Sequence, residues 1–167
     1  MKISELLLID FDDEMDKTRR TLERIPEKDP DWKPHDKSMG LGRLALHVAR
    51  LPDFFTRILT TTGMNLATEK FAPIVFESTA HLLTELERSS TEMKSRLLAS
   101  SDDELNISWK ASFGPQILIE APRMRLYRTM FLNHLVHHRA QLGVYLRLLD
   151  IPVPALYGPS KDEPLIN

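Results

Sequence analysis

Four stretches of the sequence place apolar residues at steps of three and four, and this spacing constrains the fold more than any other feature. Apolar positions at such steps line one face of an α-helix. The predicted helices run from Ser4 to Pro26, from about Ser38 to near Gly63, from Ser78 or Thr79 to the polar cluster at 100–103, and from Pro122 to about Asp150. We therefore predict an all-α fold, a four-helix bundle that forms one domain over residues 1–167.

The segments between these helices carry other signals. Residues 26–38 hold three prolines and many charges, which predicts a loop, and Trp32 is expected to hold this loop against the core. In residues 105–120 apolar and polar residues alternate on both sides of Gly114-Pro115, which predicts a short β-hairpin between the third and fourth helices. Residues 65–77 are expected to be a linker, and the proline-punctuated tail 151–167 is expected to be non-helical. Pro52 is expected to kink the second helix.

Composition excludes several classes of function. The 167 residues include no cysteine, which excludes disulfides, thiolate zinc sites, iron–sulfur clusters and a cysteine nucleophile. A net charge of −2 argues against general nucleic-acid binding. The N-terminus lacks the pattern of a targeting segment and no stretch is apolar enough to span a membrane, so we expect a cytoplasmic protein without membrane partners.

The histidines carry the main chemical signal. On the fourth helix His134 and His138 are four residues apart, so their side chains project from the same face. They fall near the centre of an arc with Gln141 and several apolar residues, and His47 shares the apolar arc of the second helix. All three imidazoles are therefore predicted to point into the bundle.

Three converging imidazoles suit Zn²⁺, Ni²⁺ or Fe²⁺ and leave one coordination position open. The alternative is that each histidine hydrogen-bonds within the core. Three imidazoles without partners would be costly to bury, whereas one shared ion would satisfy all of them. We favour a site for one divalent transition metal at His47, His134 and His138.

Two segments of the sequence also resemble a known family. Residues 32–51, WKPHDKSMGLGRLALHVARL, and residues 130–160, which include His134-x3-His138-Arg139-x-Gln141 and the tail motif VPALYGPS, look like the DinB-like superfamily of metal-binding four-helix bundles. The resemblance covers nearly the whole chain. It implies ligands at His47, His134 and His138 and a nickel, zinc or iron ion. The family often has glycine where this chain has Ala140, on the outside of the helix.

Several other polar residues were weighed as part of a site. We expect His35 to be a solvated loop residue, His81 to be structural, and His137 to bond to another helix. Arg139 is expected to point away from the core, and surface positions are favoured over a role beside the ion for Asp10, Glu14 and Asp53. The residues that could line a pocket or matter by resemblance are Tyr127, Tyr145, Gln141 and Tyr157.

The leading hypothesis for function is a metal-dependent enzyme that acts on a small molecule by hydrolysis or by transfer of a metal-activated thiol. Within the resembled family some members are described with such activities, and for many no reaction is established. The alternative is a non-catalytic, stress-linked protein in which the ion stabilises the bundle. Nucleic-acid binding is the weakest hypothesis.

The back of the fourth helix predicts a partner. Leu132, Val136, Ala140, Gly143 and Leu146 form an apolar strip opposite the histidine arc, rimmed by Arg125, Arg128, Arg139 and Arg147. Either the hairpin or a second copy of the chain must cover this strip. We predict a homodimer through or beside this helix, since two-fold dimers are the commonest closed assemblies.

Overall fold

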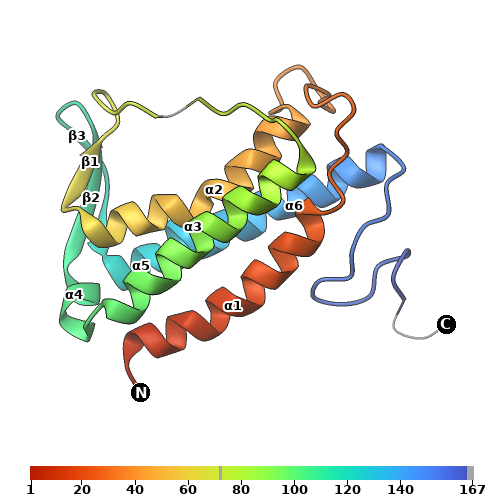
Figure 1. Ribbon diagram of the computed structural model, residues 1–167. Helices are drawn as coiled ribbons and strands as arrows, with labels where there is room; N and C mark the ends of the chain where they lie inside the picture. The colour runs from red at the N-terminus through yellow and green to blue at the C-terminus, as the bar shows by residue number, and fades with distance from the viewer. Residues whose placement is uncertain (72, 165–167) are drawn as a thin grey trace.

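The computed structural model describes residues 1–71 and 73–164, and the chain in these ranges is mostly helical with a small sheet at one end (Figure 1). The last residues of the predicted tail, 165–167, lie outside the described residues, as does position 72 of the predicted linker. None of the helices in the described ranges is both long enough and apolar enough to cross a membrane. The helices are α1 (Ile3–Leu22), α2 (Leu41–Thr60), α3 (Thr79–Ala99), α4 (Asp102–Asn106), α5 (Arg123–Leu126) and α6 (Asn133–Leu148), and a π-helical turn, η1 (Tyr127–Leu132), joins α5 to α6.

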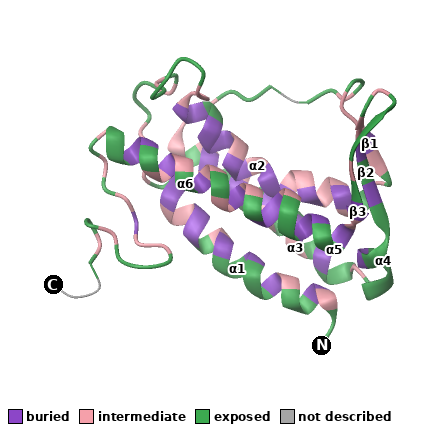
Figure 2. Cartoon of the chain, turned by 180° about the vertical axis from the view of Figure 1, so that it is seen from behind, coloured by how far each residue is buried: buried purple, intermediate pink, exposed green. Residues whose placement is uncertain are grey.

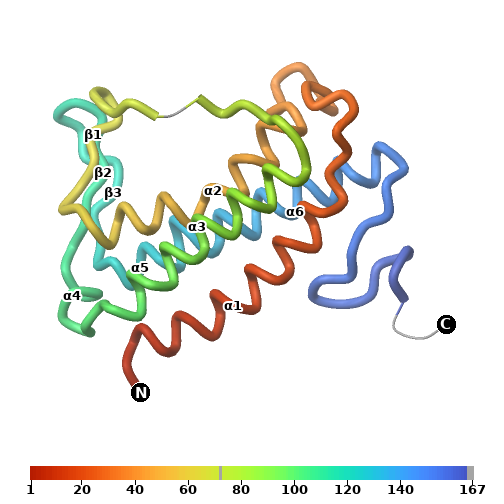
Figure 3. Tube along the Cα trace, viewed as in Figure 1, coloured from red at the N-terminus to blue at the C-terminus, as the bar shows by residue number. Residues whose placement is uncertain are grey.

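Helix α2 is the centre of the helical layer. It packs against α3 and α6, and α1 packs against α3 and also contacts α2 and α6 (Figures 1 and 3). Residues on several sides of α2 are buried, including Leu44, Leu46, Val48 and Phe55, as expected of a helix surrounded by others. Pro52 lies inside this helix as predicted. The buried positions face the middle of the helical layer, whereas the outer side of α1 is largely exposed (Figure 2).

The predicted hairpin is present but belongs to a three-stranded sheet. Strands β2 (Ser108–Phe113) and β3 (Gln116–Pro122) pair antiparallel around a turn in which Gly114 has φ +57°, in the left-handed region that favours glycine. Strand β1 (Gly63–Asn65), which we had expected to end the second helix and begin a linker, pairs parallel with β2. A three-residue strand has too short a pattern to stand out in the sequence.

The sheet is fastened to the end of α2. Trp109 on β2 is fully buried, and its indole N–H donates to Thr61 Oγ1 over 2.9 Å. The Arg123 guanidinium donates to the Thr61 carbonyl (2.9 Å) and to the Glu104 carbonyl (3.2 Å). A cation at this position also complements the negative C-terminal end of α2.

The proline-rich loop and the tail lie at the other end of the molecule (Figure 1). Trp32 packs edge-on against Tyr145 with 5.5 Å between ring centroids, which confirms that it holds the loop against the core. The tail is non-helical in the residues described, as predicted. Its Glu163 pairs with Arg20 of α1 (2.8 Å) and with Arg24 just after that helix (2.5 Å).

The predicted fourth helix is interrupted by the π-helical turn. There the Asn133 N–H donates to the Arg128 carbonyl five residues earlier, so one extra residue enters the turn. Residues before and after this turn therefore do not line up along one face as they would on a continuous α-helix. Leu132 and Leu146, predicted on an outer strip, are only 4% and 0% exposed.

The tail also covers part of that strip. Val153 lies 3.8 Å from where a Cβ on Gly143 would stand, and the tail's Asp162 pairs with Arg147 over 2.5 Å. A segment of the same chain therefore covers a surface that we had assigned to the hairpin or a second copy.

Two helical glycines give a test of how closely the chain packs. A Cβ on Gly42 would lie 2.6 Å from Phe76 Cβ and 2.9 Å from Pro30 Cβ, too close for a stable contact, whereas Gly143 has room for one. We expect Gly42→Ala to lower the free energy of unfolding by about 1–3 kcal/mol. Gly143→Ala should leave it unchanged or raise it by up to about 1 kcal/mol. Urea unfolding of both variants measures this, and equal effects would contradict the packing.

Candidate metal centre

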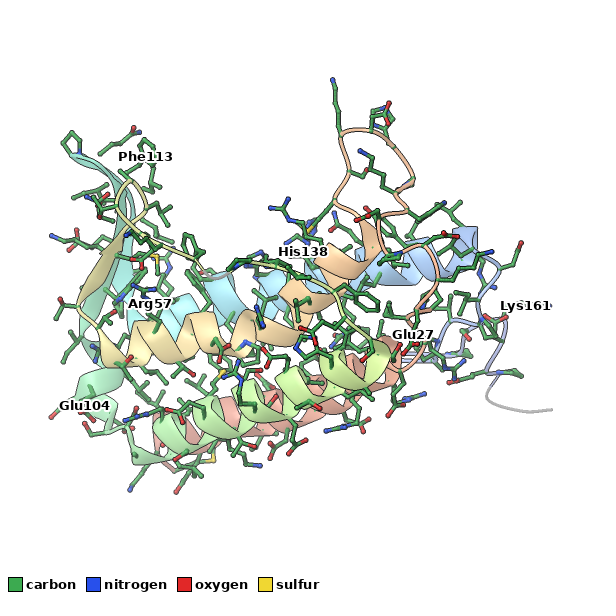
Figure 4. The ribbon with its side chains drawn as sticks, turned by 45° about the horizontal axis from the view of Figure 1, so that its top comes forward. Glu27, Arg57, Glu104, Phe113, His138 and Lys161 are labelled. Atoms are coloured by element: carbon green, nitrogen blue, oxygen red, sulfur yellow. The ribbon has the colours of Figure 1, made fainter. Side chains whose placement is uncertain are left out.

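The structure brings together the three histidines that the sequence analysis favoured. His47 comes from the middle of α2, and His134 and His138 come from consecutive turns of α6. One ligand nitrogen from each can be chosen so that all three lie within 4.8 Å of one another. Figure 4 shows His138 between the sheet end, marked by Arg57 and Phe113, and the loop end, marked by Glu27 and Lys161.

The distance between two of the histidines fits a shared ion better than a direct hydrogen bond. The Nε2 atoms of His47 and His134 are 3.4 Å apart, whereas a normal hydrogen bond from a ring N–H is about 2.9–3.0 Å long. Two nitrogens bound to one tetrahedral ion at about 2.0–2.1 Å would lie about 3.3–3.4 Å apart. The separation of the two Nε2 atoms therefore matches two ligands of one ion.

The electrostatic surroundings of His47 and His134 favour the neutral imidazoles that ligation requires. Burial, together with His138, His134 and Arg43, lowers the pKa of His47 to about 4. Burial and the neighbouring His138 also lower the pKa of His134, although a hydrogen bond with the Met130 backbone partly opposes the shift. Neutral imidazoles offer a free lone pair, so the metal would not have to displace protons at pH 7.

Gln141 fixes the orientation of one ring. Its Oε1 lies 2.7 Å from His138 Nδ1, so the proton of the neutral ring belongs on Nδ1 and the lone pair of Nε2 faces the cluster. A hydrogen bond of this kind typically orients histidine ligands of metals in proteins. We had placed Gln141 on the histidine arc as a pocket residue, and the structure gives it this closer contact.

A cavity of about 470 Å³ adjoins the cluster, and His47 and His134 form part of its wall. Met130 and Asp53 also line it, and Asp53, with its side chain 37% exposed and paired with Arg88, has the surface position that we predict. The tyrosines do not line it. Tyr127 is buried and donates to the Leu7 carbonyl over 2.6 Å, and Tyr145 donates to the Met39 carbonyl over 3.1 Å.

The remaining histidines lie outside the cluster. His35 is exposed in the loop, as predicted, and its Nδ1 accepts from the Lys37 N–H over 3.1 Å. His81 lies in the first turn of α3, away from the cluster. His137 is exposed, and in the ranges 1–71 and 73–164 no hydrogen bond joins it to another helix, so that prediction is wrong. Its position on the outer side of α6 directs it to solvent.

Arg139 and Glu14 are both buried, so the surface positions predicted for them are wrong. Arg139 is 1% exposed and pairs with Glu14, which is 8% exposed, instead of lying on the surface. Arg139 also donates to the Glu14 carbonyl and to Thr18 Oγ1, each over 3.0 Å, and to the Tyr157 hydroxyl. Tyr157 in turn donates to Glu14 Oε2 over 2.6 Å. The tail, α1 and α6 thus meet at one buried ion pair. One feature of the sequence indicates that Arg139 is buried.

That feature is the spacing of Arg139 from its neighbours. Leu135, Leu142 and Leu146 stand at −4, +3 and +7 from it, and all three are buried. A charged residue in the middle of such a stripe has to be paired.

Comparison with known proteins places the chain in a family. The model of the DinB family matches residues 1–165. The fold is similar to that of a DinB-like protein from Bacillus cereus (TM-score 0.70, 21% identity, 92% of this chain and 97% of that one). It is also similar to a protein assigned to the DinB family from Exiguobacterium sibiricum (TM-score 0.66, 21% identity, 92% and 96% covered) and to a DinB-like protein from Bacillus subtilis (TM-score 0.67, 16% identity, 89% and 96% covered). None of the curated proteins compared with the sequence matches it. Because the family model spans almost the whole sequence, this chain belongs to the DinB family.

Proposed function

We propose that the protein binds one divalent transition metal ion through His47, His134 and His138, on the scaffold of a four-helix bundle built from α1, α2, α3 and the α5–η1–α6 segment. We further propose that the bound ion serves a reaction on a small molecule. The observation that carries this proposal is the convergence of three ligand nitrogens within 4.8 Å at the wall of a cavity. A purely structural ion would not need a cavity of about 470 Å³ beside it.

The protein residues prepare the site before any ion arrives. Gln141 holds the His138 ring with Nε2 directed to the cluster, and burial keeps His47 and His134 unprotonated. When bound by three imidazoles, a divalent ion supplies an activated water with a pKa near 7 or binds a thiol as thiolate. The open side of the cluster would let a substrate reach that position from the cavity. Nickel, zinc and iron all suit such a ligand set.

Activity screening tests the catalytic part of the proposal. Protein loaded with zinc, nickel or iron would be assayed against esters, amides and thiol cofactors with electrophilic acceptors, with the metal-free protein and His134→Ala as controls. We expect turnover that requires both the metal and His134. If the metal binds but no substrate class is turned over, and its removal unfolds the protein, the non-catalytic alternative is correct.

The homodimer stays a prediction, but the apolar strip on which it was based is less exposed than the sequence suggests. Part of the strip on α6 is covered by the tail, and Val144 and Leu148, at 58% and 56% exposed, are the apolar residues left open nearby. We expect light scattering to give about twice 19.2 kDa. Val136→Glu should dissociate the dimer without changing metal content, because residue 136 is not in the histidine cluster. A monomer mass for the parent protein would contradict the prediction.

A further inference from the structure

The cavity beside the histidine cluster has walls of distinct chemistry. Its apolar lining comes from four parts of the fold, three of which are regular elements: Leu51 and Phe54 on α2, Met64 on β1, and Met130 on η1. Phe71 and Ile74 border it from the connection between β1 and α3. The two histidines stand at one side of this apolar surface, so a group bound there would lie next to the proposed metal position.

The charged residues at this cavity are already neutralised. Each one has an opposite charge within ion-pair distance, and none of the three pairs carries a net charge. The pairs are Arg50 with Glu85 (2.6 Å), Arg57 with Glu69 (2.6 Å), and Asp53 with Arg88 (2.5 Å). Arg88 also lies 3.4 Å from Glu85, so the first and third pairs form one network. Arg43, whose charge acts on His47, is exposed and does not line the cavity.

This charge balance restricts what the cavity would bind. An anionic group would have to take Arg50 or Arg57 from its carboxylate, and a cationic group would have to take Asp53 from Arg88. Either exchange gives up an existing ion pair for a new one while the entering charge loses its own hydration, so a charged group gains little from these side chains. An uncharged apolar group, by contrast, gains from leaving water and disturbs no pair.

We propose that this cavity binds an uncharged, apolar portion of the substrate, an alkyl or aryl group, next to the histidine cluster. This inference rests on the proposed function, because it names the class of substrate for the same site. It can be tested separately, because binding of an apolar group needs no metal. The cavity would therefore favour substrates whose entering part is uncharged over those whose entering part carries a charge.

Displacement of a fluorescent probe tests the proposal on the metal-free protein. N-phenyl-1-naphthylamine, an uncharged probe whose emission rises in apolar surroundings, would be bound first and then displaced by 1-decanol, decanoate or decylammonium. We expect decanol to displace it at a concentration roughly tenfold or more below that of either ion, which corresponds to about 1.4 kcal/mol. Equal or better displacement by decanoate or decylammonium would overturn the proposal, as would a probe that does not bind.

A pair of matched variants locates the binding. Met130→Trp places a larger side chain into the cavity and should weaken probe binding more than tenfold. Met124→Trp makes the same change in the same helical segment at a residue that is 38% exposed and does not line the cavity, and should leave binding unchanged. If both variants lose probe affinity equally, or if neither loses any, the probe binds elsewhere and the proposal for this cavity is refuted. If Met130→Trp does not fold by circular dichroism, the comparison of the three displacing compounds decides the matter.

Zinc affinity measured on the same proteins separates the two proposals. Met130→Trp should keep zinc affinity while losing the probe, because Met130 is not one of the three histidine ligands and its hydrogen bond with His134 is made by the backbone, which the substitution keeps. Probe binding without any zinc binding would support the cavity and contradict the metal centre. Zinc binding without probe binding would support the metal centre and contradict the apolar cavity.

Discussion

Replacing His134 by alanine is expected to lower the affinity for zinc by more than about 100-fold. Loss of a residue that merely hydrogen-bonds a metal ligand already costs about 10–100-fold, and loss of a ligand nitrogen should cost more. The Nε2 of His134 lies 3.4 Å from that of His47, so this substitution removes one of two nitrogens whose separation matches two ligands of one ion. Competition with a chromophoric chelator measures the affinity on metal-free protein prepared without a nickel column.

Two neighbours on α6 provide the controls for this prediction. His137→Ala removes an exposed imidazole whose ring centroid is 4.9 Å from that of His138, and should change zinc affinity by less than about threefold. Gln141→Leu removes the hydrogen bond to His138 Nδ1 and should cost about 10–100-fold. The assignment of ligands would be wrong if His134→Ala bound zinc as tightly as the parent, or if His137→Ala lost as much affinity.

Replacing Glu14 by glutamine is expected to lower the free energy of unfolding by about 3–5 kcal/mol. The substitution keeps the size of the side chain but leaves the Arg139 guanidinium, only 1% exposed, without its carboxylate. A loss of this size is a large fraction of the 5–15 kcal/mol that stabilises a typical domain. Urea unfolding at pH 7 gives the measurement.

The matched control is a surface ion pair from the same helix. Asp12 pairs with Lys94 over 2.6 Å, but both side chains are about half exposed (55% and 45%). Asp12→Asn should therefore cost no more than about 1 kcal/mol. The double variant Glu14→Met/Arg139→Met should recover much of the loss, because it leaves no unpaired charge in the core. An effect of Glu14→Gln no larger than that of Asp12→Asn would contradict the buried pair.

Acid should reduce the difference between the parent and Glu14→Gln. Burial by itself would raise the pKa of Glu14, but hydrogen bonds from Tyr157 and Arg139 and the charges of Arg139 and Lys17 outweigh it and hold the pKa below its usual value. The unfolded chain then binds this proton more readily than the folded one. The stabilisation by Glu14 is therefore present above its ordinary pKa and is lost as the pH falls through the lower folded value. The same unfolding curves measured at decreasing pH test this.

The sequence by itself determined which residues form the long helices and which histidines lie on their inner faces. Spacing along one helix fixes the relative direction of its side chains, so His134 and His138 had to project together. The apolar stripe around His47 likewise directed it inward.

The sequence also marks the start of α4 through the Ser101-x-x-Glu104 pattern, in which Glu104 accepts from the Ser101 N–H. The prediction treats these residues as the end of the third helix and so misses this short helix.

Only the tertiary structure decided the features that depend on residues far apart in the sequence. Parallel pairing of β1 with β2 joins residues 63–65 to 110–112, and nothing local in three residues predicts it. The π-helical turn changed which residues of α6 face the core, because one extra residue in a turn rotates everything after it. Glu14 and Arg139, 125 positions apart, make a favourable buried pair only because the fold brings them into contact, since either charge alone would be excluded from the core.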